Sequence, residues 1–172
     1  MPDIPPPLPP RLRRGNRQPV QDFSPDEVLY LRVPPLQLDE EELDFFPPTK
    51  IPSPAFSVNR GRFSEPQDVI INRPGYGIAA FIVRDVPPSI ATGPNAVYEF
   101  RVVHEPCEVY CNAITRNEPC DCNYAHSEIQ VFKDGKKIEN NRVPKSVKPA
   151  FKDILSKKIL IIQQPSREPY ES

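Results

Sequence analysis

The sequence contains few of the residues from which catalytic loops and membrane spans are built. Its 172 residues include no tryptophan, one methionine, two histidines and six glycines. The six glycines nowhere form a glycine-rich phosphate loop, so this class of nucleotide site is excluded. No apolar run approaches the roughly 20 residues that a membrane-spanning helix needs. The first residues also lack the apolar block of a secretory signal, and we therefore expect a cytoplasmic protein with no membrane partner.

Proline is abundant and unevenly placed. The chain has 25 prolines, and more than half of them lie before residue 55. Proline fixes φ and removes a backbone donor, so this part of the chain cannot be continuous helix or central strand. We expect residues 1–22 to be a disordered, proline-rich arm that folding does not require, and residues 164–172 to be a flexible tail. Residues 23–163 then form a single domain.

The arm allows two interpretations. Residues 5–11 have the spacing and the terminal arginine of a polyproline II ligand for an aromatic groove, and the alternative is a solvated tail. The formal net charge of the chain is −1, but the arm is basic and residues 21–46 are acidic. The arm has no aromatic residue that could stack on a base, so nucleic acid is only weakly supported as its partner. Another protein is the partner we expect.

Hydrophobic patterning predicts an α+β fold, a small, mainly antiparallel sheet with one C-terminal helix. Strands are expected at residues 28–33, 69–71, 76–83, 97–103 and 127–133. Asp134 and Gly135 mark a hairpin turn. Apolar residues at three- and four-residue spacing from Val147 to Leu155, preceded by Ser146, predict the helix, and residues 159–162 end the core.

Three segments are less clearly patterned. The run at 77–83 is compatible with a buried helix of small residues as well as with a strand. The acidic segment at 39–46 has the spacing of a short helix. Residues 53–64 are rich in small polar and cationic groups, and only a turn near residues 59–61 is expected there.

The cysteines form a cluster that the two histidines of the chain bracket. Within the Cys-rich loop at 104–126, the pattern is made by His104, Cys107, Cys111, Cys120, Cys122 and His126. Thiolate and imidazole groups at such spacing can bind a tetrahedral zinc ion, but this spacing is not a standard zinc knuckle. Reduced, unligated cysteines and disulfides are the alternatives. If zinc binds, the four cysteines form one closed, structural site, with His104 and His126 as alternate ligands.

His126 is the most interesting candidate for catalysis. It lies beside Ser127 and Glu128 at the start of an expected strand, where a histidine can act as a general acid or base. The alternative is a half-exposed histidine bonded to a backbone carbonyl. Arg60 and Arg62 are candidates for holding a phosphate or a carboxylate, or are solvent-facing charges.

Four short segments resemble a loosely defined group of uncharacterised bacterial proteins. They are YLRV at 30–33, SPAFSVNR at 53–60, PGYGIA at 74–79 and YAHSE at 124–128. The resemblance covers about residues 28–163, and the sequence departs from the pattern at Leu31 and in the added cysteine loop. It implies a single bacterial domain that is one component of a multi-gene, defence-type system, and it carries over no activity.

A second resemblance concerns the order of three residue types. ADP-ribosyltransferase-type folds place an Arg or His on a first strand, a Ser on a second and a Glu on a later one. Here Arg32, Ser57 or Ser64, and Glu128 fall in that order. The resemblance implies a nucleotide substrate that these residues would hold.

Two functions therefore stay open. The first is an accessory or binding module. The second is a small enzyme, nuclease-like or ADP-ribosyltransferase-like, that acts on a nucleotide or nucleic acid with His126 and an arginine or Glu128. A pocket that joins His126 to Arg32, Arg60 or Arg62 would favour the enzyme, and dispersed positions would favour the binding module.

Overall fold

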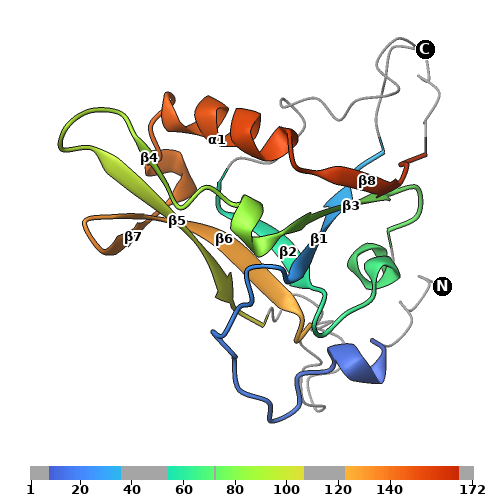
Figure 1. Ribbon diagram of the computed structural model, residues 1–172. Helices are drawn as coiled ribbons and strands as arrows, with labels where there is room; N and C mark the ends of the chain where they lie inside the picture. The colour runs from blue at the N-terminus through green and yellow to red at the C-terminus, as the bar shows by residue number, and fades with distance from the viewer. Residues whose placement is uncertain (1–7, 36–53, 72, 107–122, 167–172) are drawn as a thin grey trace.

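The computed structural model describes residues 8–35, 54–71, 73–106 and 123–166. These residues form one eight-stranded sheet and one α-helix (Figure 1). The strands are β1 (Val28–Val33), β2 (Phe56–Arg60), β3 (Gly77–Ile82), β4 (Ser89–Ala91), β5 (Val97–His104), β6 (His126–Lys133), β7 (Lys136–Ile138) and β8 (Leu160–Gln163). The helix is α1 (Val147–Ser156), and four 3₁₀ turns are η1 (Pro10–Leu12), η3 (Pro66–Ile70), η4 (Val83–Asp85) and η5 (Asn140–Arg142).

The strands follow the order β4-β5-β6-β2-β1-β3-β8. The first half of β6 pairs with β2, and its last three residues, 131–133, pair with β7. Every strand pair among the described residues is antiparallel. The predicted α+β fold, with a mainly antiparallel sheet and one C-terminal helix, is confirmed. Among the described residues, no helix is long and apolar enough to cross a membrane.

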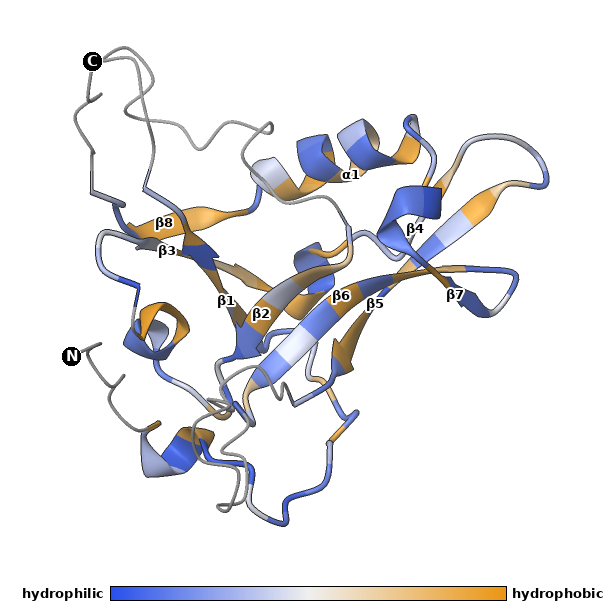
Figure 2. Ribbon diagram, turned by 180° about the vertical axis from the view of Figure 1, so that it is seen from behind, coloured by the Kyte–Doolittle hydropathy of each residue, from blue (hydrophilic) through white to orange (hydrophobic). Residues whose placement is uncertain are grey.

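The helix covers one face of the sheet and closes the core. Val147, Phe151 and Leu155 are fully buried, and they recur at the four-residue spacing that places side chains on one helix face. The ring of Phe151 packs against Phe56 of β2 and Phe100 of β5, with centroids 6.2 and 4.7 Å apart. Figure 2 shows the apolar side of α1 turned toward the sheet.

The hairpin prediction at Asp134 and Gly135 is also confirmed. Both residues have positive φ, 51° and 73°, and join β6 to β7 with Lys133 opposite Lys136. Two consecutive residues at positive φ are typical of a type I′ turn, whose twist suits an antiparallel hairpin.

Several local predictions differ from the structure. Residues 66–70 form η3 where a strand was expected at 69–71, whereas the strand expected at 76–83 is confirmed as β3 and its helical alternative is not found. Pro66 begins this turn, and the Asp68 carboxylate accepts a hydrogen bond from the Glu65 N–H at 2.8 Å. Residues 56–60, where only a turn was expected, form the central strand β2. The helix expected at 39–46 lies outside the described residues.

Part of the expected proline-rich arm lies among the described residues. Its residues 8–22 lie along one end of the sheet, and η1 forms within them (Figure 1). Leu8 and Leu12 are buried with Ala125, and Phe63 and Ile71 pack against them. Two leucines, four residues apart, therefore supply apolar contacts that the proline-rich composition conceals. Residues 1–7 lie outside the described residues.

Candidate functional site

A cleft of about 660 Å³ lies on the sheet face opposite α1, between the arm and the strands β5, β6 and β7. His126, Glu128 and Gln130 share this face because alternate residues of a strand point the same way. Their neighbours Ser127, Ile129 and Val131 are buried on the other face. The cleft therefore contains two of the catalytic candidates, His126 and Glu128, together with side chains from distant parts of the chain.

The ring of His126 is held by two hydrogen bonds. Nδ1 contacts the backbone carbonyl of Glu105, and Nε2 lies 3.0 Å from Oγ of Ser57. A carbonyl only accepts, so Nδ1 carries a proton, and Nε2 forms its hydrogen bond with the Ser57 hydroxyl, which can donate or accept. Ser57 reaches Nε2 because the register of β2 and β6 places it opposite Glu128, one pleat from His126. The arrangement is that of an oriented histidine ring beside a hydroxyl group.

Two carboxylates share one amide in the same cleft. Gln130 is almost fully buried, and its Nε2 donates to Glu105 at 2.8 Å and to Glu128 at 3.1 Å. The Nζ of Lys137 lies 3.8 Å from the same Glu128 oxygen, Oε2. Within the described part of the chain, no hydrogen bond or ion pair engages the Oε1 atoms of Glu105 and Glu128. These oxygens can accept from a ligand.

Arg60 does not take part in this cleft, because it is a buried structural residue. Its side chain has no exposed surface, and it forms a two-point ion pair with Glu27, Nε to Oε1 at 2.7 Å and a terminal nitrogen to Oε2 at 2.8 Å. It also donates to the carbonyls of Val20 and Asp22, and the Phe23 ring covers its guanidinium at 3.8 Å. These contacts use four of the five N–H groups of Arg60 within the protein.

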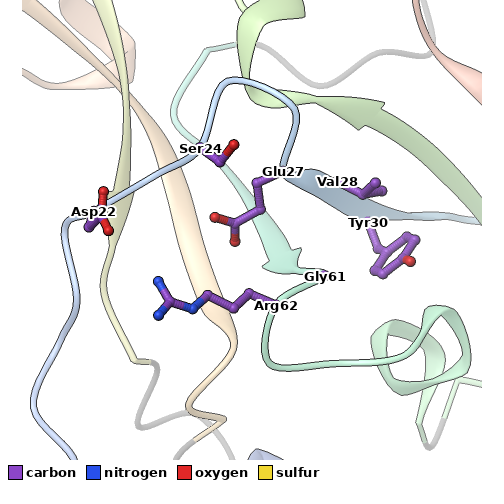
Figure 3. A pocket seen from close by; sticks show the side chains of 7 residues that line it. All are labelled: Asp22, Ser24, Glu27, Val28, Tyr30, Gly61 and Arg62. Atoms are coloured by element: carbon purple, nitrogen blue, oxygen red, sulfur yellow. The ribbon is translucent and has the colours of Figure 1, made fainter.

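The other arginines are dispersed. Arg62 lines a separate pocket of about 430 Å³ with Glu27, Tyr30 and Asp22, whose side chains are shown in Figure 3. Arg32 is exposed on β1, beyond Tyr30, where the pairing of β1 with β2 ends. Neither residue lines the cleft beside His126.

The arginine–serine–glutamate order does not assemble at this cleft. The register of β2 and β6 brings Ser57 and Glu128 together, but Arg32 does not line the cleft. Ser64 is buried, and its hydroxyl donates to the Arg60 carbonyl at 2.7 Å. The cleft contains Arg14 and Lys137 as cations instead.

His104 is a core residue of the arm contact. His104 is only 1% exposed, and its ring stacks on the ring of Phe63 with centroids 5.4 Å apart. Nδ1 accepts from the Val20 N–H at 2.8 Å, and Nε2 donates to the Tyr124 carbonyl. Burial lowers the pKa of His104 below its ordinary value. The hydrogen bond to the Tyr124 carbonyl partly opposes this shift, and the positive charge of Arg60 lowers the pKa further.

The predicted zinc ligands can be placed only in part. Cys107, Cys111, Cys120 and Cys122 lie outside the described residues. Both ring nitrogens of His104 and of His126 are engaged with protein groups, so neither ring offers a free nitrogen to a metal in this conformation. In the described residues, no group of three or more metal-binding side chains is found.

Sequence reasoning missed Ser57, Glu105 and Lys137 as neighbours of His126. Ser57 lies in a segment where only a turn was expected. Glu105 directly follows β5 and Lys137 lies on β7, and the sequence does not specify the register of these strands. A local signal did exist for Gln130, since His126, Glu128 and Gln130 alternate along one strand. Comparison of the chain with protein-family models, curated proteins and solved structures finds no match.

Proposed function

We propose that the chain is a cytoplasmic binding module that binds another protein through the cleft beside His126. The observation that carries this proposal is the Glu105–Gln130–Glu128 group, in which a buried amide holds two carboxylates side by side. Each carboxylate keeps one oxygen that no described residue engages, so a partner's lysine or arginine can bind to both. That the module belongs to a multi-gene, defence-type bacterial system stays a prediction from the resemblance.

The positions of the arginines support binding over catalysis. An enzyme that acts on a phosphate or nucleotide needs cations aimed at the reacting group. Arg60 is used internally, and Arg32 and Arg62 lie away from the cleft. The remaining cations, Arg14 and Lys137, share the cleft with two carboxylates, which suits a partner surface with charges of both signs.

Co-purification with charge variants tests this function. The double variant Glu105→Gln and Glu128→Gln keeps the size and hydrogen-bonding capacity of both side chains but removes their charge. It should lose the partner that the wild-type chain retains. Glu99→Gln is the matched control, because Glu99 is an exposed β5 residue that pairs with Arg101 outside the cleft. Retention of the same partner by the double variant would contradict the proposal.

A second function, the small enzyme acting on a nucleotide or nucleic acid, is favoured by one contact. Nε2 of His126 lies 3.0 Å from Oγ of Ser57, and Glu128 lies in the same cleft. In this function His126 is the general base and Glu128 the acid. Incubation with RNA, single-stranded DNA and NAD should show turnover that His126→Ala abolishes without a change in melting temperature. Turnover that survives this substitution would refute the role of His126.

We also propose that the four cysteines hold one structural zinc ion. This proposal rests on the spacing of the cysteines in the sequence alone. Protein purified without added metal should contain about one zinc per chain, and Cys120→Ser should lower the zinc content and the stability together. His126→Ala should leave the zinc content unchanged, because the ring is already bonded to Glu105 and Ser57. Metal-free protein with four free thiols would contradict the zinc site.

A further inference from the structure

Residues 8–14 of the arm occupy a groove built by two other segments of the chain. We call this the arm groove and define it by Phe63, Asp68, Ile71, Tyr124 and Ala125. The first three come from the segment after β2, and the last two come from the segment before β6. The arm residues that enter it are Leu8, Arg11 and Leu12, the last of which is 1% exposed.

An arginine–carboxylate pair fixes the position of the arm. Nε of Arg11 donates to Oδ2 of Asp68 and a terminal nitrogen donates to Oδ1, both at 2.7 Å. This is the two-point geometry that arginine forms and lysine cannot. Glu65 adds a contact at 3.3 Å. The hydrogen bond to Asp68 also raises the pKa of Arg11, because it stabilises the charged guanidinium.

A hydrogen bond within η3 orients the groove side of this pair. The side chain of Asp68 is 3% exposed, and the Glu65 N–H donates to its Oδ2 at 2.8 Å within η3. This local bond and the two bonds from Arg11 use both oxygens of the carboxylate. A buried carboxylate needs a cation, because a buried charge without a partner is costly.

The backbone of the arm also contacts the rest of the chain. Pro9 has φ −53° and ψ 145°, the polyproline II conformation, before the single turn of η1. The Tyr124 N–H donates to the Leu12 carbonyl at 2.7 Å, and Arg13 forms an isolated bridge with Asn123. One hydrogen-bonded backbone group, two apolar side chains and one arginine are the elements by which domains bind short proline-rich peptides.

The geometry points to a peptide-binding function for the arm groove. We infer that it binds a proline-rich segment of a partner protein in which leucine and arginine lie three residues apart, as Leu8 and Arg11 do here. Residues 8–14 are then the resident occupant, which competes with the partner in cis. This site is separate from the cleft beside His126, because Phe63, Asp68, Ile71 and Ala125 do not line that cleft.

The test uses the full chain with the arm weakened and the groove intact. Arg11→Glu places a like charge against Asp68 and Glu65 and should displace the arm. A fluorescein-labelled peptide with the sequence of residues 8–14 should then bind this chain at least tenfold more tightly than it binds the wild-type chain, as measured by fluorescence anisotropy. Arg101→Glu is the matched control, since it makes the same charge change at an exposed β5 residue that pairs with Glu99 and contacts neither the arm nor Asp68. It should bind like wild type.

Three further measurements make the result specific. A peptide with Arg11→Ala and a scrambled peptide of equal charge should each lose at least tenfold in affinity, and Asp68→Asn in the Arg11→Glu chain should do the same. A folded Arg11→Glu chain that does not bind the peptide, or that binds the scrambled peptide equally, would overturn the inference. Arm-exchanged dimers that the peptide does not dissociate would also overturn it. If Arg11→Glu does not fold, Arg11→Ala carries the same comparison.

Discussion

Replacing Arg60 by methionine should lower the free energy of unfolding by about 3–5 kcal/mol, the usual cost of removing one partner from a buried ion pair. Arg60 has no exposed side-chain surface, and the Glu27 side chain that it neutralises is only 8% exposed. Without Arg60, Glu27 keeps a buried charge, and the carbonyls of Val20 and Asp22 lose their donor. Methionine fills most of the volume, so the loss reports electrostatics more than a cavity.

Urea unfolding followed by circular dichroism measures this loss. With a slope of about 1–3 kcal/mol per molar urea, the midpoint should fall by more than about 1 M. The double variant Arg60→Met with Glu27→Gln should be more stable than Arg60→Met alone, because it leaves no buried charge without a partner. A loss below about 1 kcal/mol, which is the range of exposed ion pairs, would refute the reasoning. So would a double variant no more stable than the single one.

The other predictions concern the core, the arm and pH. Phe151→Ala should cost about 3–5 kcal/mol in urea unfolding, while Ile154→Ala on the exposed side of α1 should cost clearly less; equal losses would contradict the helix orientation. Deleting residues 1–22 should lower the melting temperature by more than about 5 °C, and an unchanged value would show that the arm contacts carry no stability. The lowered pKa of His104 means that below pH 6.5 this residue binds more protons in the unfolded chain than in the folded one. The free energy of unfolding should therefore decrease as the pH is lowered through this range, by up to about 1.4 kcal/mol per pH unit. His104→Gln should lose less between pH 7.5 and 5.5, and an equal loss would exclude His104 as the cause.

Local signals in the sequence were sufficient for the helix and the β6–β7 hairpin. The apolar spacing of α1 and the Asp134–Gly135 pair each predict the local structure from a few neighbouring residues. The strand β1 was equally clear, because Leu29, Leu31 and Val33 alternate toward the core. In each of these elements, the periodicity of apolar residues matches the buried face that the fold provides.

The central strand β2 was missed because its C-terminal half is polar and buried. Asn59 and Arg60 resemble loop residues, and only their partners Asn123 and Glu27, both distant in sequence, make them strand residues. The register of β2 sets the positions of Ser57 and Arg60 on opposite faces of the sheet. The same distant partners explain why the buried ion pair of Arg60 could not be predicted from the sequence.

The arm shows where composition misleads. High proline content predicts disorder on average, but Leu8, Arg11 and Leu12 are enough to hold residues 8–14 when a groove with a buried carboxylate is available. The sequence did contain a signal, since residues 5–11 have the pattern of a polyproline II ligand. It could not show that the receptor for such a ligand lies in the same chain.

The proposal that a partner protein binds the cleft beside His126 is tested most directly by site-specific photo-crosslinking in cells. A photoreactive residue at Lys137, on the rim of the cleft, should crosslink to the partner, and Glu105→Gln with Glu128→Gln should remove the crosslinked product. The same residue placed at Asp153, exposed on α1 over the opposite face, should give no such product. A partner crosslinked from Asp153 and not from Lys137 would contradict the proposal.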